Sequence, residues 1–201
     1  KMNIRKIIPF AFLFKTKKKK LQKQPLKFFS LTFLLPTICG IGKFPLFPGT
    51  IGSLVAIIEF YCYISIMNWG IYKIITMVFI IVIISFYAIQ NYINYTKNTD
   101  PKEVIIDEYI GQHLTIFLVY VLFYYTNPEA VFINEQYVIN YPILILSFTF
   151  FRLFDILKPY PVSYFDEKFH NSFGVIMDDV VAAVMASIAT ILIYFIYTVA
   201  I

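Results

Sequence analysis

The chain has 201 residues, of which 59% are hydrophobic and only 14% are charged. Soluble domains carry roughly 25% charged residues, so the composition excludes an ordinary soluble enzyme and favours an integral membrane protein. The net charge of +5 is unevenly distributed, because residues 1–27 carry ten cations and no acid, while residues 28–201 are mildly acidic.

Residues 1–27 form a basic arm ahead of the apolar part of the chain. Basic arms often bind nucleic acid, but beside membrane spans we expect a cytoplasmic segment on anionic lipid headgroups and no nucleic-acid partner. The alternative is a disordered, positively charged cytoplasmic tail with no other role. Residues 28–201 are then one membrane domain.

Hydropathy predicts an all-α fold, a polytopic integral membrane helical bundle with about four to five spans. The apolar run Phe28–Cys39 is short for a span, and we expect it to be re-entrant or interfacial. Glu59 falls in mid-span without an obvious partner, so we expect it to be protonated or to reach toward the interface. The expected spans are Ile51–Met67, Ile71–Gln90, His113–Tyr125, Tyr141–Leu157 and Val180–Ile201.

Counting crossings places three charged segments on the same side of the membrane: Gly40–Ser53, Lys97–Gln112 and Phe151–Val181. The segment Asn127–Asn140, on the other side, contains no Lys or Arg. Because cytoplasmic loops are enriched in Lys and Arg, we expect the charged segments to be active-site loops that face the cytoplasm.

Arg152, Asp155 and Lys158 are spaced by three residues, which predicts one face of a helix that ends at Pro159 and Pro161. One interpretation is an internal salt-bridge ladder. The other is a phosphate clamp, in which the guanidinium binds in a bidentate manner and the ammonium acts as a point charge.

Two pairs of adjacent acids, Asp107 with Glu108 and Asp178 with Asp179, belong to the same predicted side. Either pair alone is typical of a helix N-terminus, where acids interact favourably with the helix dipole. Together they would repel one another unless a cation were bound. All-oxygen ligands favour Mg²⁺.

Asp166 and His170 are four residues apart, on one face of an expected helix. With Asp155 they are candidates for the catalytic acid or base, and the sequence leaves open which residue takes this role. The segment FPGTIGS offers backbone N–H groups and the hydroxyls of Thr50 and Ser53 at the start of a span, a plausible phosphate-binding site.

Several catalytic classes lack their motifs in this chain. Neither Cys39 nor Cys62 has an arginine at the sixth following position, and there is no GxSxG or Walker sequence. The remaining enzyme class is metal-assisted attack of water on a phosphorus ester.

Three separated motifs occur in a distinctive order. They comprise Gly40, Gly42, Pro45, Pro48, Gly49, Thr50, Gly52 and Ser53, then Asp107, Glu108 and Gly111, then Arg152, Asp155, Lys158, Pro159, Pro161, Phe165, Asp166, His170, Gly174, Met177, Asp178 and Asp179. From about residue 30 to residue 201 the chain resembles the phosphatidylglycerophosphatase A family of bacterial membrane enzymes.

The resemblance implies Mg²⁺-dependent hydrolysis of phosphatidylglycerophosphate to phosphatidylglycerol and phosphate, with the active site on the cytoplasmic side of the bacterial inner membrane. The substrate and the surrounding membrane lipids are then the partners. The implied metal ligands are Asp107, Glu108, Asp178 and Asp179, and the implied phosphate ligands include Arg152 and Lys158.

Two other classes of function stay open from the residues alone. In a non-enzymatic transporter or ion-coupled channel, Glu59 and the row from Arg152 to Lys158 would form a relay. In a structural scaffold, the basic arm would recruit partners. The sequence leaves the oligomeric state open.

Overall fold

The computed structural model describes residues 30–98, 101–128, 131–133, 136–169 and 172–200. The basic arm at residues 1–27 and His170 therefore lie outside the described residues. Within them the fold is helical, which confirms the all-α prediction apart from one very small hairpin.

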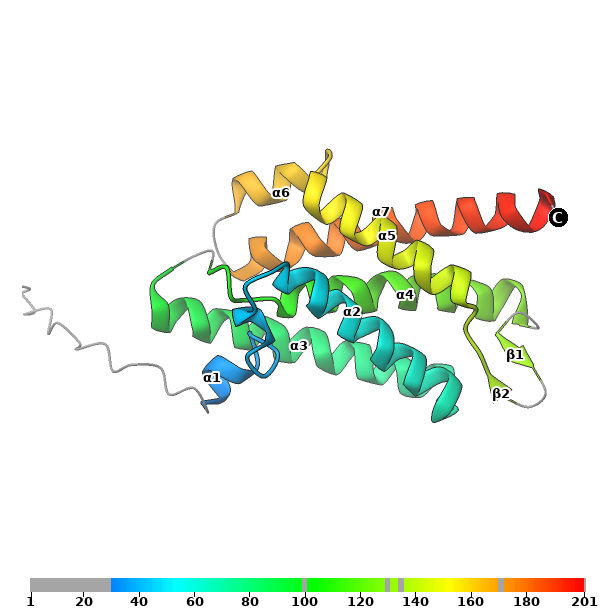
Figure 1. Cartoon of the computed structure of the whole chain (residues 1–201), viewed down its shortest axis with the longest axis horizontal. Coiled ribbons are helices and arrows are strands. Elements are labelled where there is room, and N and C mark those ends of the chain that lie inside the picture. Colours follow the sequence, from blue (N-terminus) through cyan, green and yellow to red (C-terminus); the bar gives the residue numbers. More distant parts are fainter. Residues whose placement is uncertain (1–29, 99–100, 129–130, 134–135, 170–171, 201) are drawn as a thin grey trace, which may run out of the picture.

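Five long helices lie along one another (Figure 1): α2 Pro48–Tyr61, α3 Ile71–Thr96, α4 Ile106–Thr126, α5 Tyr141–Leu157 and α7 Ser172–Ala200. The π-helical segment Cys62–Ile66 continues α2. The short elements are α1 Leu31–Leu34, a 3₁₀ turn at Ile41–Lys43, α6 Val162–Lys168, and the antiparallel pair β1 Phe132–Ile133 and β2 Gln136–Tyr137.

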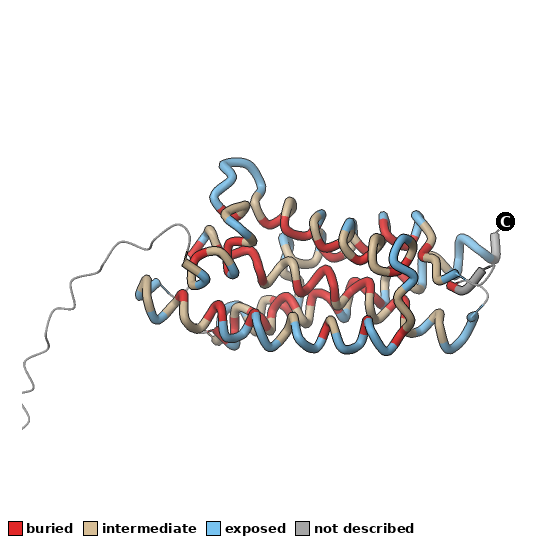
Figure 2. The backbone as a smooth tube through the Cα atoms, turned by 90° about the horizontal axis from the view of Figure 1, so that it is seen from below, coloured by how far each residue is buried: buried red, intermediate tan, exposed pale blue. Residues whose placement is uncertain are grey.

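Three helical segments are long and apolar enough to cross a membrane: Pro48–Ile66, Ile71–Thr96 and Ser172–Thr198. Large apolar side chains on the outer face of α3, among them Phe79 and Ile83, are more than half exposed. Figure 2 shows the buried residues along the inner sides of the helices. An apolar outer face on a helix of this length is suited to lipid, so the chain is a membrane protein.

Helix α4 is the centre of the bundle and packs against α2, α3, α5 and α7. Its buried Ile116 and Tyr120 belong to one apolar core with Phe60 from α2 and Ile74 from α3. Because α4 contacts every other long helix, groups on its first turn can meet groups from several elements at the same end of the bundle.

The described part of the apolar run Phe28–Cys39 forms the single turn α1, which packs against α3. Phe33 is buried there against Ile89 and Tyr92. The described part of this segment is therefore too short to cross a membrane.

Several helices begin earlier than hydropathy predicts. Helix α4 starts at Ile106 rather than His113, and α7 starts at Ser172 rather than Val180. The prediction of active-site loops is therefore wrong for Asp107, Glu108 and the acids of α7. Hydropathy scores acids as loop residues, although acids in a first turn interact favourably with the helix dipole.

Candidate active site

The first turn of α4 carries Asp107 and Glu108, both partly buried. Two hydrogen bonds restrain the backbone at the start of this turn. The N–H groups of Ile105 and Ile106 both donate to the carbonyl oxygen of Pro36, at 2.9 and 3.2 Å. The position of both carboxylates is thus tied to the turn that follows α1.

The second turn of α7 carries Asp178 and Asp179, which are only 7% and 5% exposed. Helix α7 comes close to α4 here, since a Cβ placed on Gly111 would lie 3.2 Å from Cβ of Asp179 and 2.5 Å from the Phe151 ring. A glycine in α4 thus lets Asp179 approach the two acids at the start of that helix.

Asp107, Glu108 and Asp179 each offer a carboxylate oxygen, and these three atoms lie within 4.8 Å of one another. Asp107 Oδ1 and Glu108 Oε2 are buried and have no hydrogen-bond partner among the described residues. Buried polar atoms normally have a partner, and three converging carboxylates need a positive charge. The donor set fits a hard cation that takes oxygen ligands, so this cluster could hold a metal ion.

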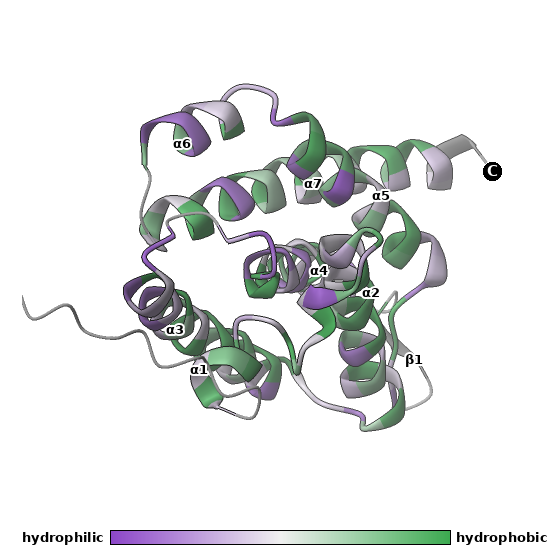
Figure 3. Cartoon of the chain, turned by 60° about the vertical axis from the view of Figure 1, so that its left-hand side comes forward, coloured by the Kyte–Doolittle hydropathy of each residue, from purple (hydrophilic) through white to green (hydrophobic). Residues whose placement is uncertain are grey.

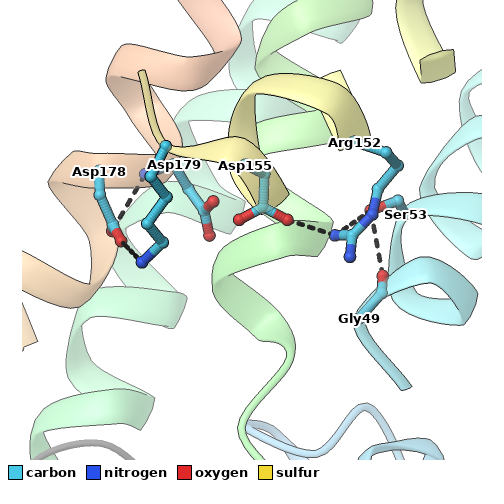
Figure 4. Close-up of polar contacts among 7 residues, drawn as sticks. Gly49, Ser53, Arg152, Asp155, Asp178 and Asp179 are labelled. Atoms are coloured by element: carbon cyan, nitrogen blue, oxygen red, sulfur yellow. Dashed lines mark hydrogen bonds and ion pairs between the residues drawn. The ribbon is translucent and has the colours of Figure 1, made fainter. Parts of the chain in front are cut away.

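Arg152, on α5, is held from two sides (Figure 4). Its Nη1 donates to Asp155 Oδ2 at 2.5 Å and to Ser53 Oγ at 3.4 Å, and the serine hydroxyl donates to the Gly49 carbonyl at 3.1 Å. A Cβ on Gly49 would lie 2.1 Å from Glu108 Oε1. The start of α2 therefore needs glycine to make room for Glu108 beside the guanidinium.

Lys158 does not continue the helical row that its spacing predicts. It caps α5 in the left-handed backbone region, with φ 44°, and its Nζ donates to Asp178 Oδ2 at 2.9 Å and to Asp166. Burial would lower the pKa of Lys158, but the hydrogen bonds and negative charges of the two aspartates outweigh burial and raise it. Lys158 thus stays charged and connects α6 to α7.

These groups surround one cavity of about 510 Å³ at the end of the bundle that Figure 3 brings forward. Its acidic lining residues are Asp107, Glu108, Asp155, Asp166, Asp178 and Asp179. Its basic lining residues are Lys102, Arg152 and Lys158. The volume suits a small headgroup, and the excess of acids over bases suits an additional cation.

The family model for phosphatidylglycerophosphatase A matches residues 34–194. The chain belongs to this family. It is 31% identical to phosphatidylglycerophosphatase A of Haemophilus influenzae, over 83% of this chain and 93% of the relative. It is 30% identical to phosphatidylglycerophosphatase A of Escherichia coli, over 84% of this chain and 87% of the relative.

A relative from Bacteroides thetaiotaomicron carries the provisional name of a phosphatidylinositol-3-phosphatase. It is 31% identical, over 79% of this chain and 90% of its own length. No solved structure matches the chain. Proteins similar to this chain are thus named for two different phosphorylated lipids.

The structure places eight of our eleven candidate site residues in the lining of this cavity, and two others lie outside it. Thr50 lies in the first turn of α2 and Ser53 is fully buried, and neither lines the cavity. Ser53 instead positions Arg152. The remaining candidate, His170, is outside the described residues.

Glu59 has a partner in the structure that its position in the sequence does not indicate. The hydroxyl of Tyr109, on α4, donates to Glu59 Oε2. The same tyrosine ring packs against His113, with ring centroids 4.4 Å apart. This partly buried acid therefore joins α2 to α4, and only the three-dimensional fold brings these positions together.

Proposed function

We propose that this protein is a magnesium-dependent phosphatase that hydrolyses phosphatidylglycerophosphate to phosphatidylglycerol and phosphate in the cavity at the acidic end of the bundle. The observation that carries the proposal is the convergence of Asp107, Glu108 and Asp179 beside two fixed cations, in a member of this family. A lipid phosphatase needs this combination at the water–lipid boundary.

We assign the metal to Asp107, Glu108 and Asp179. Asp178 lies beside them, but it holds Lys158 through one oxygen and accepts the Asp179 backbone N–H, at 3.1 Å, through the other. When bound, Mg²⁺ would withdraw charge from the phosphoryl oxygens and stabilise the charge that develops on them.

Arg152 and Lys158 are the residues that we assign to the substrate phosphate. Asp155 and Ser53 fix the guanidinium on one side of the cavity, and Asp166 and Asp178 fix the ammonium on the other. Groups held in place before the substrate arrives need little reorganisation during the reaction, which is the main source of electrostatic catalysis.

In the reaction, a water oxygen forms a bond to the terminal phosphorus while the bond from phosphorus to the glycerol oxygen breaks. One side chain accepts a proton from the water, and the leaving oxygen takes up a proton. The described candidates for proton transfer are Asp155 and Asp166, which line the cavity outside the metal cluster. His170 remains a further candidate.

The orientation follows from charge. We propose that α2, α3, α4, α5 and α7 all cross the bacterial inner membrane, with the cavity on the cytoplasmic side. Three of them are long and apolar enough to span by themselves. The cavity end carries Lys97, Lys102 and Lys158, whereas Lys73 lies near the start of α3 at the opposite end. Cytoplasmic segments are enriched in Lys and Arg.

Family membership favours an enzyme over a transporter or an ion-coupled channel, and a feature of the fold agrees. Six described acids and three described cations line the cavity at one end of the bundle, and Glu59, in mid-span, is bonded to Tyr109. A relay would require ionisable groups spread through the depth of the membrane.

The test is phosphate release from a panel of lipid phosphate monoesters by the purified protein in detergent, with Mg²⁺ and with a chelator. We expect release from phosphatidylglycerophosphate that stops when the metal is removed and returns when Mg²⁺ is added. Asp179→Asn should abolish this release while the melting temperature in detergent stays close to that of the wild type. Full activity in Asp179→Asn would contradict the metal assignment.

A further inference from the structure

Three described cations line the cavity, and Lys102 is the only one of them that forms no ion pair with a described carboxylate. Arg152 is paired with Asp155, and Lys158 is paired with two aspartates. Lys102 lines the same cavity, is exposed, and lies within 4.0 Å of no described acid. A lysine at the wall of an acidic cavity with no ion pair there is available to an anionic ligand.

The backbone beneath Lys102 is firmly anchored. Its neighbour Pro101 is buried, and the Val104 N–H donates to the Pro101 carbonyl at 3.0 Å. The Tyr92 hydroxyl donates to Glu103 Oε1 at 2.8 Å, and a Cβ on Gly42 would lie 1.9 Å from the Glu103 carbonyl oxygen. The turn that carries Lys102 therefore packs against Tyr92 on one side and Gly42 on the other. These contacts restrain the backbone position from which the Lys102 side chain extends.

The proposed substrate carries two phosphates of different kinds. The terminal phosphomonoester is the one that is cleaved, and a phosphodiester links the headgroup to diacylglycerol and stays in the product. That phosphodiester keeps its negative charge at any physiological pH. Bringing it into a cavity lined by six carboxylates is unfavourable unless a cation meets it.

We propose that Lys102 binds the phosphodiester of the lipid substrate and selects lipids in which such a group separates the acyl chains from the cleaved phosphate. This inference rests on the proposed function. The remaining cations are already engaged at the terminal phosphate by our assignment, and Ile156 gives the cavity an exposed apolar edge beside which the acyl chains can remain in the bilayer.

Lys102→Gln tests this role against two lipids with identical short acyl chains in neutral detergent micelles. Phosphatidylglycerophosphate contains the phosphodiester, while phosphatidic acid carries its phosphomonoester directly on diacylglycerol. We expect kcat/KM for the first lipid to fall about tenfold, mainly through KM, as is usual for the loss of a charge-assisted contact. The value for phosphatidic acid should change less than about twofold, and Lys102→Arg should restore most of the loss.

A second measurement does not depend on turnover of phosphatidic acid. Phosphatidylglycerol retains the phosphodiester and lacks the monoester, so its inhibition constant should rise about tenfold in Lys102→Gln. The matched control is Lys97→Gln, an exposed lysine in the same connection between α3 and α4 that does not line the cavity. Neutral micelles remove general attraction of lysine to an anionic membrane surface.

Unchanged constants in Lys102→Gln would overturn the inference, as would equal losses for both lipids or equal losses in Lys97→Gln. These outcomes differ from failure of the proposed function, in which the wild-type protein itself would release no phosphate from phosphatidylglycerophosphate.

Discussion

Each end of the bundle has a cavity, and the two cavities have similar volumes but different lining residues. The acidic end holds a cavity of about 510 Å³, and the opposite end holds one of about 560 Å³ between the end of α2, the start of α5 and the end of α7. The second cavity is lined by Tyr61, Ser65, Val138, Ile139, Asn140, Tyr141, Pro142, Tyr194 and Tyr197.

Four polar side chains at the tyrosine-lined end bond in pairs, while the Ser65 hydroxyl, which is neutral, is buried there with no described partner. The hydroxyls of Tyr61 and Tyr141 lie 3.1 Å apart, and Asn140 Nδ2 donates to the Tyr194 hydroxyl at 3.1 Å. At the acidic end, by contrast, buried oxygens of Asp107 and Glu108 have no described partner. Volume therefore does not distinguish an active site here, whereas unsatisfied charge does.

The sharpest test of this contrast removes one charge from the proposed metal site. Asp107→Asn keeps the side-chain shape but weakens a metal ligand, and we expect phosphatase activity to fall more than about 100-fold, since changes even to outer-shell partners of metal ligands cost about 10- to 100-fold. Tyr197→Phe, at the opposite end, should leave activity unchanged. The measurement is phosphate release at saturating Mg²⁺, and similar activities of the two variants would contradict the contrast.

A smaller loss is expected from Arg152→Lys. A lysine keeps the charge but cannot hold Asp155 and Ser53 with one planar group while it also meets a phosphate. We expect kcat to fall about 10- to 100-fold, below the loss expected when a whole transition-state contact is removed. Lys73→Arg, an exposed site near the opposite end, is the control. If kcat of Arg152→Lys equals that of the wild type, the planar guanidinium group is not required for the reaction.

One glycine at each end of the bundle can be replaced by alanine, so that the effect of one added methyl group on the metal requirement can be compared between the two ends. In Gly49→Ala the new Cβ would fall 2.1 Å from Glu108 Oε1, so Glu108 must move. We expect the Mg²⁺ concentration for half-maximal activity to rise about tenfold, within the range for a disturbed metal shell. In Gly70→Ala the new Cβ would lie 3.2 Å from the Tyr137 hydroxyl oxygen, the far end of a side chain. Its metal requirement should be that of the wild type, and an equal rise in both variants would point to general destabilisation.

The smallest effect is expected at the tyrosine-lined end. Tyr194→Phe removes the acceptor for Asn140, which should lower the free energy of unfolding by about 0.5–1.5 kcal/mol. The phosphatase activity of the folded protein should not change. Thermal unfolding in detergent and phosphate release, measured on the same sample, would separate the two, and a loss of activity without a loss of stability would assign this end a role in the reaction.

The sequence predicted about four to five long helices, and the structure has five; it also predicted that the charged segments meet at one end. Alternating crossings of short-linked helices bring Asp107 and Asp178 to one end whatever the details of packing, and the structure places both in one cavity. The acids were predicted to lie in loops because a hydropathy scale detects the apolar part of a helix and does not detect its polar turns.

Other features depended on the path of the backbone or on distant packing. Lys158 leaves the row of Arg152 and Asp155 because its φ is positive, and no spacing rule anticipates that change of direction. Ser53 faces Arg152 across 99 positions, and Tyr109 faces Glu59 across 50, so these contacts exist only once the helices have packed.

The placement of the proposed metal ligands on α4 and α7 has a mechanical consequence. Asp107 and Asp179 are themselves residues of α4 and α7, so a change in the tilt of α7 against α4 would alter the spacing of their carboxylates. Bilayer thickness alters helix tilt at modest energetic cost. We therefore expect Mg²⁺ affinity to depend on lipid chain length, and identical affinities in thin and thick vesicles would show that the two helices move as one body.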